Sequence, residues 1–182
     1  MSEANLSGVY WYARPDGSYW TLEAGKAEAN LADRSYFQRA LRGEAVLGEL
    51  VVSKSTAANV GVVAMPVRGR DGAVSGVIGV SVYLDQLSDR LREEMGLSED
   101  VLFYAFDEQN RLALHSETEK LFLRAGELGP QVEEAFREIQ TRKEGVISYT
   151  LEDRPRTVVF RQSPVTGWWY AFGVIGDVPP QG

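Results

Sequence analysis

The first half of the chain alternates between short apolar runs and turn-forming residues, a pattern typical of antiparallel strands. The turn Pro15-Asp16-Gly17 predicts that the first two runs form a hairpin, because proline presets φ and glycine accepts a positive φ. A polar loop follows this hairpin. The strands predicted in this half are residues 9–14, 18–23, 47–54, 60–68 and 74–84.

Two helices are predicted in the same half of the chain. Residues 35–42 form a short helix, with Asp33 as its N-cap and Gly43 just beyond its end. Over residues 84–95 the apolar side chains recur with the period of a helix, and Gly96 ends it. This second helix is expected to connect the two halves.

The second half of the chain repeats the order of the first without repeating its residues. Residues 130–143 are predicted to form an amphipathic helix, with four apolar side chains on one face and Gly145 at its end. The strands predicted here are residues 101–107, 111–115, 146–151, 157–163 and 168–175.

Each half therefore has two strands, a helix and three more strands. Strands that follow one another without long crossovers pair antiparallel. The sequence predicts an α+β chain of two antiparallel-sheet lobes with five strands each. We expect the first lobe and the connecting helix to cover residues 1–95, and the second lobe to cover residues 96–182.

Composition narrows the function classes. Of the 182 residues, 44% are hydrophobic, which is enough for a sizeable core. The net charge of −7 opposes a nucleic-acid partner, which would require clustered basic residues. Without cysteine, disulfides and thiolate metal sites are excluded. The apolar runs are too short to span a bilayer and the start is unlike a signal peptide, so a receptor's membrane span would lie outside this sequence.

Known catalytic motifs are missing from the sequence. No GxGxxG, P-loop, HExxH or GxSxG pattern occurs. His115 is the single histidine and is expected to be structural, because catalysis or metal binding would depend on it alone. The pairs of neighbouring acidic residues are expected to lie in solvent and not to form a catalytic pair of carboxylates. The sequence thus predicts no catalytic residue, no metal site and no cofactor.

Several stretches carry a family resemblance. They are DRSYF at 33–37 with Ala40 and Gly43, SKST at 53–56, VAMPV at 63–67, residues 76–88, and residues 106–115 and 163–175. With its predicted order of elements, the sequence resembles the double-Cache sensor domain. This domain consists of two PAS-like lobes on the outer side of bacterial and archaeal chemoreceptors, histidine kinases and cyclic-dinucleotide enzymes. The resemblance covers almost the whole chain.

The resemblance implies a place for each lobe. The first lobe would be membrane-distal and would bind the ligand, and the second would be membrane-proximal. The family normally begins with a long helix alongside both lobes, which carries the dimer contact and the link to a membrane span. That helix is missing here, because the sequence starts almost directly in the first hairpin. Membrane anchoring and a homodimer are therefore expectations for a full-length receptor.

The resemblance also implies ligand contacts at Arg34 and Tyr36. An arginine donates two charge-assisted hydrogen bonds to a carboxylate, which suits this role. The alternative is an ion pair of Arg34 with Asp33 or Glu44, on the surface. The further candidates are three aromatic residues that would form apolar walls, Phe37, Trp20 and Tyr12, and two hydroxyl donors, Ser53 and Ser81. Because side chains alternate along a strand, either Tyr12 or Trp11 can face the ligand, but not both.

The ligand class follows from two serines. Amino-acid-binding members of the family hold the ligand's ammonium with acidic residues at the positions of Ser53 and Ser81. An ammonium buried without a counter-charge is strongly disfavoured. The sequence therefore favours a small carboxylate without an amine, such as acetate or propionate. Neighbouring Lys54 is expected to be a solvated edge lysine.

We therefore expect a non-catalytic sensor domain on the periplasmic or extracellular side of the membrane, in a chemoreceptor or sensor kinase. Two alternatives within the binding class stay open: an amino-acid-binding sensor and a freestanding secreted solute-binding protein. An intracellular enzyme or PAS module is disfavoured, because no catalytic set or cofactor ligand occurs.

Overall fold

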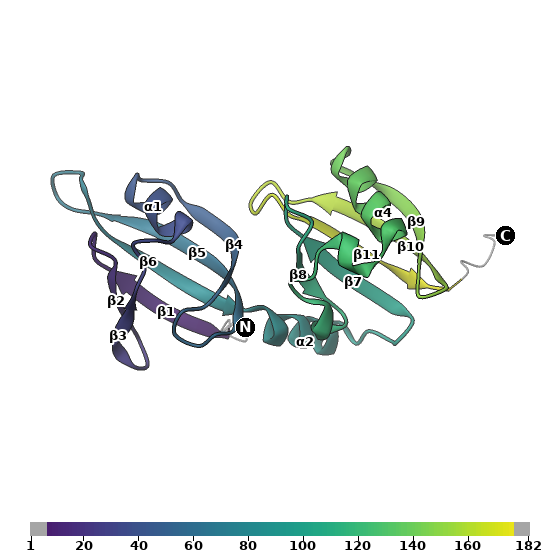
Figure 1. The fold of residues 1–182 in the computed structure, drawn as a ribbon, viewed down its shortest axis with the longest axis horizontal. Helices are drawn as coiled ribbons and strands as arrows, with labels where there is room; N and C mark the ends of the chain where they lie inside the picture. The colour runs from purple at the N-terminus through teal and green to yellow at the C-terminus, as the bar shows by residue number, and fades with distance from the viewer. Residues whose placement is uncertain (1–6, 177–182) are drawn as a thin grey trace. The chain divides into compact units, whose positions relative to one another are not determined.

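The strands of the chain form two separate antiparallel sheets (Figure 1). The structure, a computed structural model, describes residues 7–176. The chain divides into two compact units, residues 1–84 and 85–182, called here the first and second lobes. Both sheets and the few helices fit the predicted α+β double-Cache architecture. No helix within residues 7–176 is both long enough and apolar enough to cross a bilayer.

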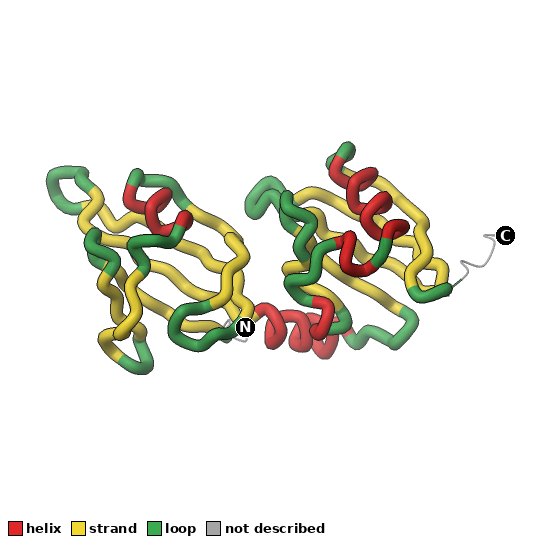
Figure 2. The backbone as a smooth tube through the Cα atoms, in the orientation of Figure 1, coloured by secondary structure: helices red, strands yellow, loops and turns green. Residues whose placement is uncertain are grey.

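The first lobe has a sheet in the order β3-β2-β1-β6-β5-β4. One short helix, α1, covers one face of it (Figure 2). The elements of this lobe are β1 (Gly8–Ala13), β2 (Ser18–Thr21), β3 (Gly25–Asn30), α1 (Ser35–Leu41), β4 (Val46–Val52), β5 (Asn59–Arg68) and β6 (Val74–Tyr83).

Alternation along β1 separates the two faces of this sheet. Trp11 and Ala13 are buried beneath α1, whereas Tyr10 and Tyr12 are each 38% exposed. The predicted split between Tyr12 and Trp11 is therefore confirmed. Helix α1 buries Phe37 completely in the same core.

The second lobe has a sheet in the order β8-β7-β11-β10-β9, with its longest covering helix, α4, on one face (Figure 1). Phe136 of α4 stacks on Phe106 with ring centroids 4.1 Å apart. The elements from Leu84 on are α2 (Leu84–Met95), β7 (Val101–Phe106), β8 (Leu112–His115), the 3-10 helix η1 (Thr118–Lys120), α3 (Ala125–Leu128), α4 (Pro130–Gln140), β9 (Glu144–Leu151), β10 (Arg154–Gln162) and β11 (Trp169–Ile175).

The first sheet has six strands where the sequence predicts five. The additional strand is β3, whose sequence GKAEAN lies in the predicted polar loop. It contains no large apolar residue and pairs only with β2 at the edge of the sheet. Backbone hydrogen bonds to β2 make this segment a strand, although its sequence lacks the alternation of apolar and polar side chains that predicts strands.

Two predicted helix ends are also corrected. Arg34, and not Asp33, is the N-cap residue of α1, and it makes no side-chain capping bond. Asp33 is instead held by Lys54. Helix α4 ends at Gln140 with Thr141 as its C-cap, and Gly145 lies inside β9. The short helices η1 and α3 have no counterpart in the sequence prediction.

His115, at the end of β8, is 3% exposed. Its Nδ1 accepts a hydrogen bond from the backbone N–H of Glu117 at 2.8 Å. Its own backbone N–H donates to the hydroxyl of Ser88 on α2 at 3.3 Å. Burial, the largest effect, lowers the pKa of His115 to about 4. The histidine is therefore a neutral, packed residue in the second lobe.

This burial predicts a pH dependence of stability. Because the pKa of His115 is lower in the folded than in the unfolded chain, its contribution is complete above about pH 6.5 and is lost as the pH falls towards 4. The loss amounts to about 3 kcal/mol of unfolding free energy. Denaturant unfolding of the unmodified chain and of His115→Asn at several pH values measures this loss of unfolding free energy. The ring resonances of this single histidine should titrate near pH 4, and titration near 6.5 would contradict the prediction.

Candidate functional site

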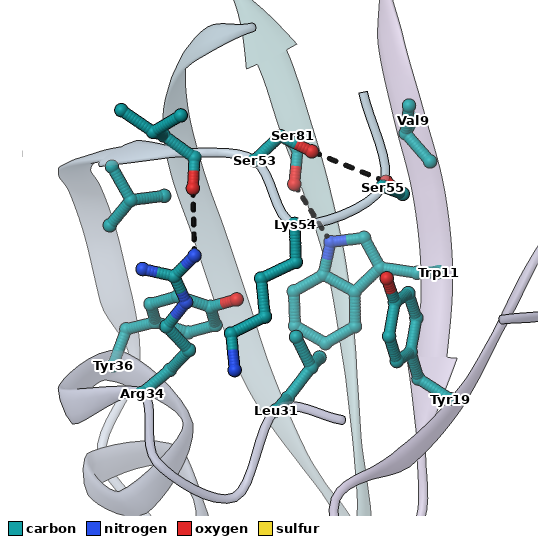
Figure 3. Close-up of a pocket in the computed structure, with 12 residues that line it drawn as sticks. Val9, Trp11, Tyr19, Leu31, Arg34, Tyr36, Ser53, Lys54, Ser55 and Ser81 are labelled. Atoms are coloured by element: carbon teal, nitrogen blue, oxygen red, sulfur yellow. Dashed lines mark hydrogen bonds between the residues drawn. The ribbon is translucent and has the colours of Figure 1, made fainter. Parts of the chain in front are cut away.

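A small cavity lies in the first lobe between the sheet and the segments that cover it (Figure 3). Its volume is about 20 Å³, which is room for about one water molecule. It is lined by Val9, Trp11, Tyr19, Leu31, Arg34, Tyr36, Val51, Val52, Ser53, Lys54, Ser55 and Ser81.

Arg34 reaches the cavity from the start of α1. Its backbone is extended, with φ −82° and ψ 129°. Its Nη2 donates to the carbonyl oxygen of Val52 at 2.8 Å (Figure 3). Its Nε is buried and has no hydrogen-bond partner within the described part of the chain. Buried donors are normally paired, so this guanidinium has capacity for another acceptor.

Tyr36, in the first turn of α1, is 4% exposed. Its ring is tilted at 48° to that of Trp11, with centroids 6.1 Å apart. Burial raises the pKa of Tyr36 to about 12, although the charge of Arg34 opposes this shift. The phenol therefore stays neutral at ordinary pH and remains a hydrogen-bond donor.

Trp11 forms the cavity wall from β1. Its Nε1 donates to the hydroxyl of Ser81 on β6 at 3.1 Å. The indole lies over Gly79, where a Cβ atom would approach its ring to 2.3 Å. Glycine at this position is therefore needed for Trp11 to lie across β6 and to reach Ser81.

Lys54 follows β4 and extends along the cavity (Figure 3). Its Nζ donates to the carbonyl oxygen of Asn30 at 2.8 Å and pairs with Asp33. The Lys54 side chain is 26% exposed, compared with 71% for Asp33. The expected solvated lysine thus lines the cavity. Close to it, the hydroxyls of Ser53 and Ser55 are 3.2 Å apart.

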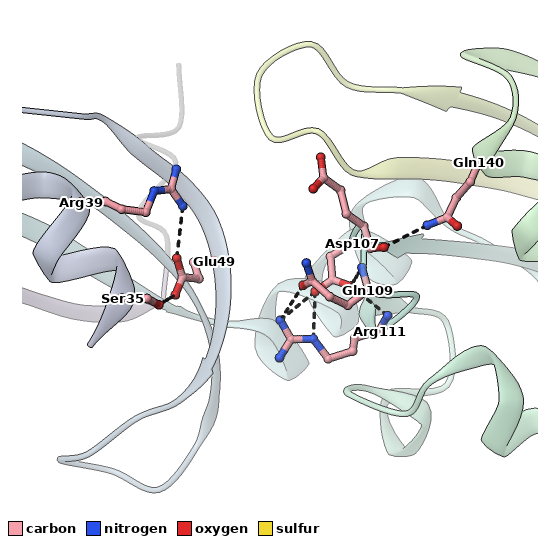
Figure 4. Close-up of polar contacts among 8 residues, drawn as sticks. Ser35, Arg39, Glu49, Asp107, Gln109, Arg111 and Gln140 are labelled. Atoms are coloured by element: carbon pink, nitrogen blue, oxygen red, sulfur yellow. Dashed lines mark hydrogen bonds and ion pairs between the residues drawn. The ribbon is translucent and has the colours of Figure 1, made fainter. Parts of the chain in front are cut away.

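Glu49 of β4 fixes the start of α1 (Figure 4). The hydroxyl of Ser35 donates to its Oε1. Nη1 of Arg39 lies 3.4 Å from its Oε2. Through these two contacts Glu49 holds α1 against β4, and this places Arg34 and Tyr36 at the cavity.

The charges around the cavity are unbalanced. Its lining includes the cations Arg34 and Lys54 but no aspartate or glutamate. Glu44, considered as a surface partner for Arg34, pairs with Arg39 and Arg42 instead. Lys54 has Asp33 at the rim, whereas Nε of Arg34 faces no acceptor among the described residues. The arrangement therefore suits a small anion.

The structure brings together four of the seven predicted site residues, namely Arg34, Tyr36, Ser53 and Ser81. The other three do not line this cavity. Phe37 is fully buried in the core, whereas Tyr12 and Trp20 are paired across β1 and β2 on the opposite face of the sheet.

Sequence reasoning did not name the lining residues Tyr19 and Leu31, and it gave Trp11 only as the alternative to Tyr12. Of the two faces of β1 that alternation left open, the one with Trp11 lines the cavity. Tyr19 and Leu31 reach the cavity through strand pairing and a loop of the first lobe, which no local pattern reveals.

Comparisons with known proteins agree with this fold. The family model for the Cache domain matches residues 2–178. No curated protein sequence matches the chain. The amino-acid chemoreceptor PctB of Pseudomonas aeruginosa PAO1, solved as a ligand-binding domain with L-Arg, is 18% identical with a TM-score of 0.69, over 92% of this chain and 70% of that chain.

Two further structures are similar. The ligand-binding domain of the chemoreceptor CtaA of Pseudomonas fluorescens, solved with L-serine, is 16% identical with a TM-score of 0.68, over 92% of this chain and 72% of its own. The extracellular domain of the putative histidine kinase rpHK1S-Z16 is 12% identical with a TM-score of 0.74, over 95% and 73%. At these identities the likeness shows a common fold.

The bond between Trp11 and Ser81 predicts a stability effect. Ser81→Ala leaves a buried indole N–H without its acceptor, so we expect a loss of about 1–3 kcal/mol in unfolding free energy. Ser75→Ala, at an exposed position of the same strand, should change it by less than about 0.5 kcal/mol. Urea unfolding followed by tryptophan fluorescence compares them, and equal effects would contradict the role of this bond.

Proposed function

This chain belongs to the double-Cache family of sensor domains, and we propose that it is the ligand-sensing part of a signal-transduction receptor and binds a small carboxylate through Arg34. Cache domains are extracytoplasmic parts of membrane receptors and are not catalytic domains. In this proposal the first lobe holds the ligand, and the parent protein is anchored in a membrane with the domain on its periplasmic or extracellular side.

The incompletely bonded guanidinium of Arg34, whose Nε is buried, is the observation that carries the proposal. A carboxylate accepts charge-assisted hydrogen bonds from an arginine in a low-dielectric site, where they are stronger than neutral ones. The neutral phenol of Tyr36 and the hydroxyls of Ser53 and Ser81 add polar groups around the same space. Trp11 and Leu31 supply apolar surface for a short aliphatic chain.

The missing acid favours a ligand without an amine. An ammonium group in this cavity would meet Arg34 and Lys54 but no carboxylate among the lining residues. Acetate, propionate and similar short acids avoid that cost.

An amino-acid ligand is the second candidate. The related domains of PctB and CtaA were solved with L-Arg and L-serine, respectively. Asp33 does not line the cavity but pairs with Lys54, which does. An amino acid would have to release Asp33 from Lys54 to neutralise its ammonium.

Ligand entry requires a movement of the cavity's cover. A space for about one water molecule is too small for even a short organic acid. The segment that includes Lys54 and Ser55 forms part of the cavity wall and is held there by few bonds, mainly those of Lys54 to Asn30 and Asp33. We infer that this segment opens and then closes on the ligand.

A thermal-shift panel tests the proposal. Acetate and propionate should raise the melting temperature, whereas L-serine, L-alanine and L-arginine at equal concentration and ionic strength should not. Saturation at about 100 times Kd corresponds to about 2.7 kcal/mol of stabilisation. Arg34→Ala should weaken propionate binding roughly ten- to a hundredfold, because it removes charge-assisted hydrogen bonds.

Arg42→Ala is the matched control, because Arg42 is an exposed arginine near the end of the same helix, 3.6 Å from Glu44 and outside the cavity. It should keep the propionate response of the unmodified protein. Stabilisation by amino acids alone would favour the second candidate. Equal propionate affinity in Arg34→Ala and the unmodified protein would refute the Arg34 site.

A further inference from the structure

The second lobe contains an arginine where its fold calls for an apolar residue. Along β10 the side chains of Arg156, Val158 and Phe160 all point to the buried face, and Arg156 is 2% exposed. On the neighbouring strands it is paired with Tyr149 of β9 and Ile175 of β11. A guanidinium in a core position is costly unless its charge and its donors are satisfied.

The described residues satisfy Arg156 only in part, through a side-chain hydrogen bond with Tyr149. Its Nε and Nη1 are buried and have no hydrogen-bond partner among residues 7–176. Its Nη2 lies 3.9 Å from Oε2 of Glu152, too far for a hydrogen bond. The Glu152 side chain is 62% exposed and also lies 3.4 Å from Nζ of Lys120. Among residues 7–176, the shared and largely exposed carboxylate of Glu152 is thus the acid within ion-pair distance of Arg156. The charge of Arg156 also helps to lower the pKa of Glu117, after the larger effects of burial, which raises it, and of Lys120 and His115.

Other hydrogen-bond donors surround the same place. Lys120 of η1 is 7% exposed and pairs with Glu117 at 2.8 Å. The hydroxyl of Tyr104 is buried without a hydrogen bond of ordinary geometry, although Tyr149 lies beside it. Burial raises the pKa of Tyr104, so this phenol is a neutral donor. We call Tyr104, Lys120, Tyr149 and Arg156 the second-lobe polar cluster.

We propose that the second-lobe polar cluster binds a small monovalent anion of about the size of chloride, with Arg156 as its main ligand. The unmet groups of Arg156 and Tyr104 are all donors, so an acceptor is what completes them. A negative charge also neutralises the buried guanidinium, which a water molecule does not. The unmet atoms are closed to solvent, which favours a compact anion over a larger organic acid. This proposal is independent of the ligand site in the first lobe.

Side-chain NMR of the whole chain reads this site directly. The Nε–H signal of Arg156, assigned by its loss in Arg156→Gln, should shift and saturate as sodium chloride replaces sodium gluconate at constant ionic strength. Gluconate is the control, because its size excludes it from an enclosed site. The Nε–H signal of Arg34 reports the first lobe separately. An Arg156 signal that is the same in both salts would overturn the proposal and leave buried water as the occupant.

Stability measurements provide a second readout. The unfolding midpoint of the unmodified chain should be higher in chloride than in gluconate, and this difference should disappear in Arg156→Gln. Tyr104→Phe removes one donor and should weaken chloride binding roughly tenfold. If Arg156→Gln does not fold, the Nε–H signal of Arg156 is assigned by through-bond correlation with its own backbone, and the NMR titration of the unmodified chain still decides. A chloride effect that persists undiminished in a folded Arg156→Gln protein would refute the site.

Discussion

The alternation of side chains along antiparallel strands is the constraint on which the rest of this structure depends. Each sheet buries one face, beneath α1 in the first lobe and mainly α4 in the second. On β1 this rule places Trp11 towards the cavity and Tyr12 away from it. A slip of one residue in the pairing of β1 with β6 would exchange the two faces. The core and the cavity therefore require the same register.

The sequence was sufficient where local patterns decide the structure. The apolar strands β5 and β6, which are joined by a clear turn, and the periodic helix α2 were predicted with nearly the observed ends. The errors arise where distant contacts decide. The polar strand β3 exists because β2 lies beside it, and Asp33 is held by Lys54, 21 residues later, instead of capping α1. The sequence around each residue does not predict either contact.

The candidate site shows the same division. Family resemblance indicated Arg34, Tyr36, Ser53 and Ser81, and these four line one cavity. Aromatic character alone indicated Tyr12 and Trp20, which lie on the other face because β1 and β2 pair them there. Lys54 was expected in solvent, but its long side chain crosses from the strand end to Asn30. Side-chain direction and reach depend on pairing between strands, which a single sequence does not specify.

The bonds around Arg34 explain how a ligand could change this lobe. In the structure, Arg34 donates to a neutral acceptor, the carbonyl oxygen of Val52. A carboxylate is a stronger acceptor, so exchanging one for the other favours the bound state. The pair of Lys54 with Asp33 resists opening only weakly, because Asp33 is largely exposed. Under the proposed function, binding energy from the guanidinium would be available to reorder the covering segment, and a ligand that binds the closed arrangement better would shift the population towards it.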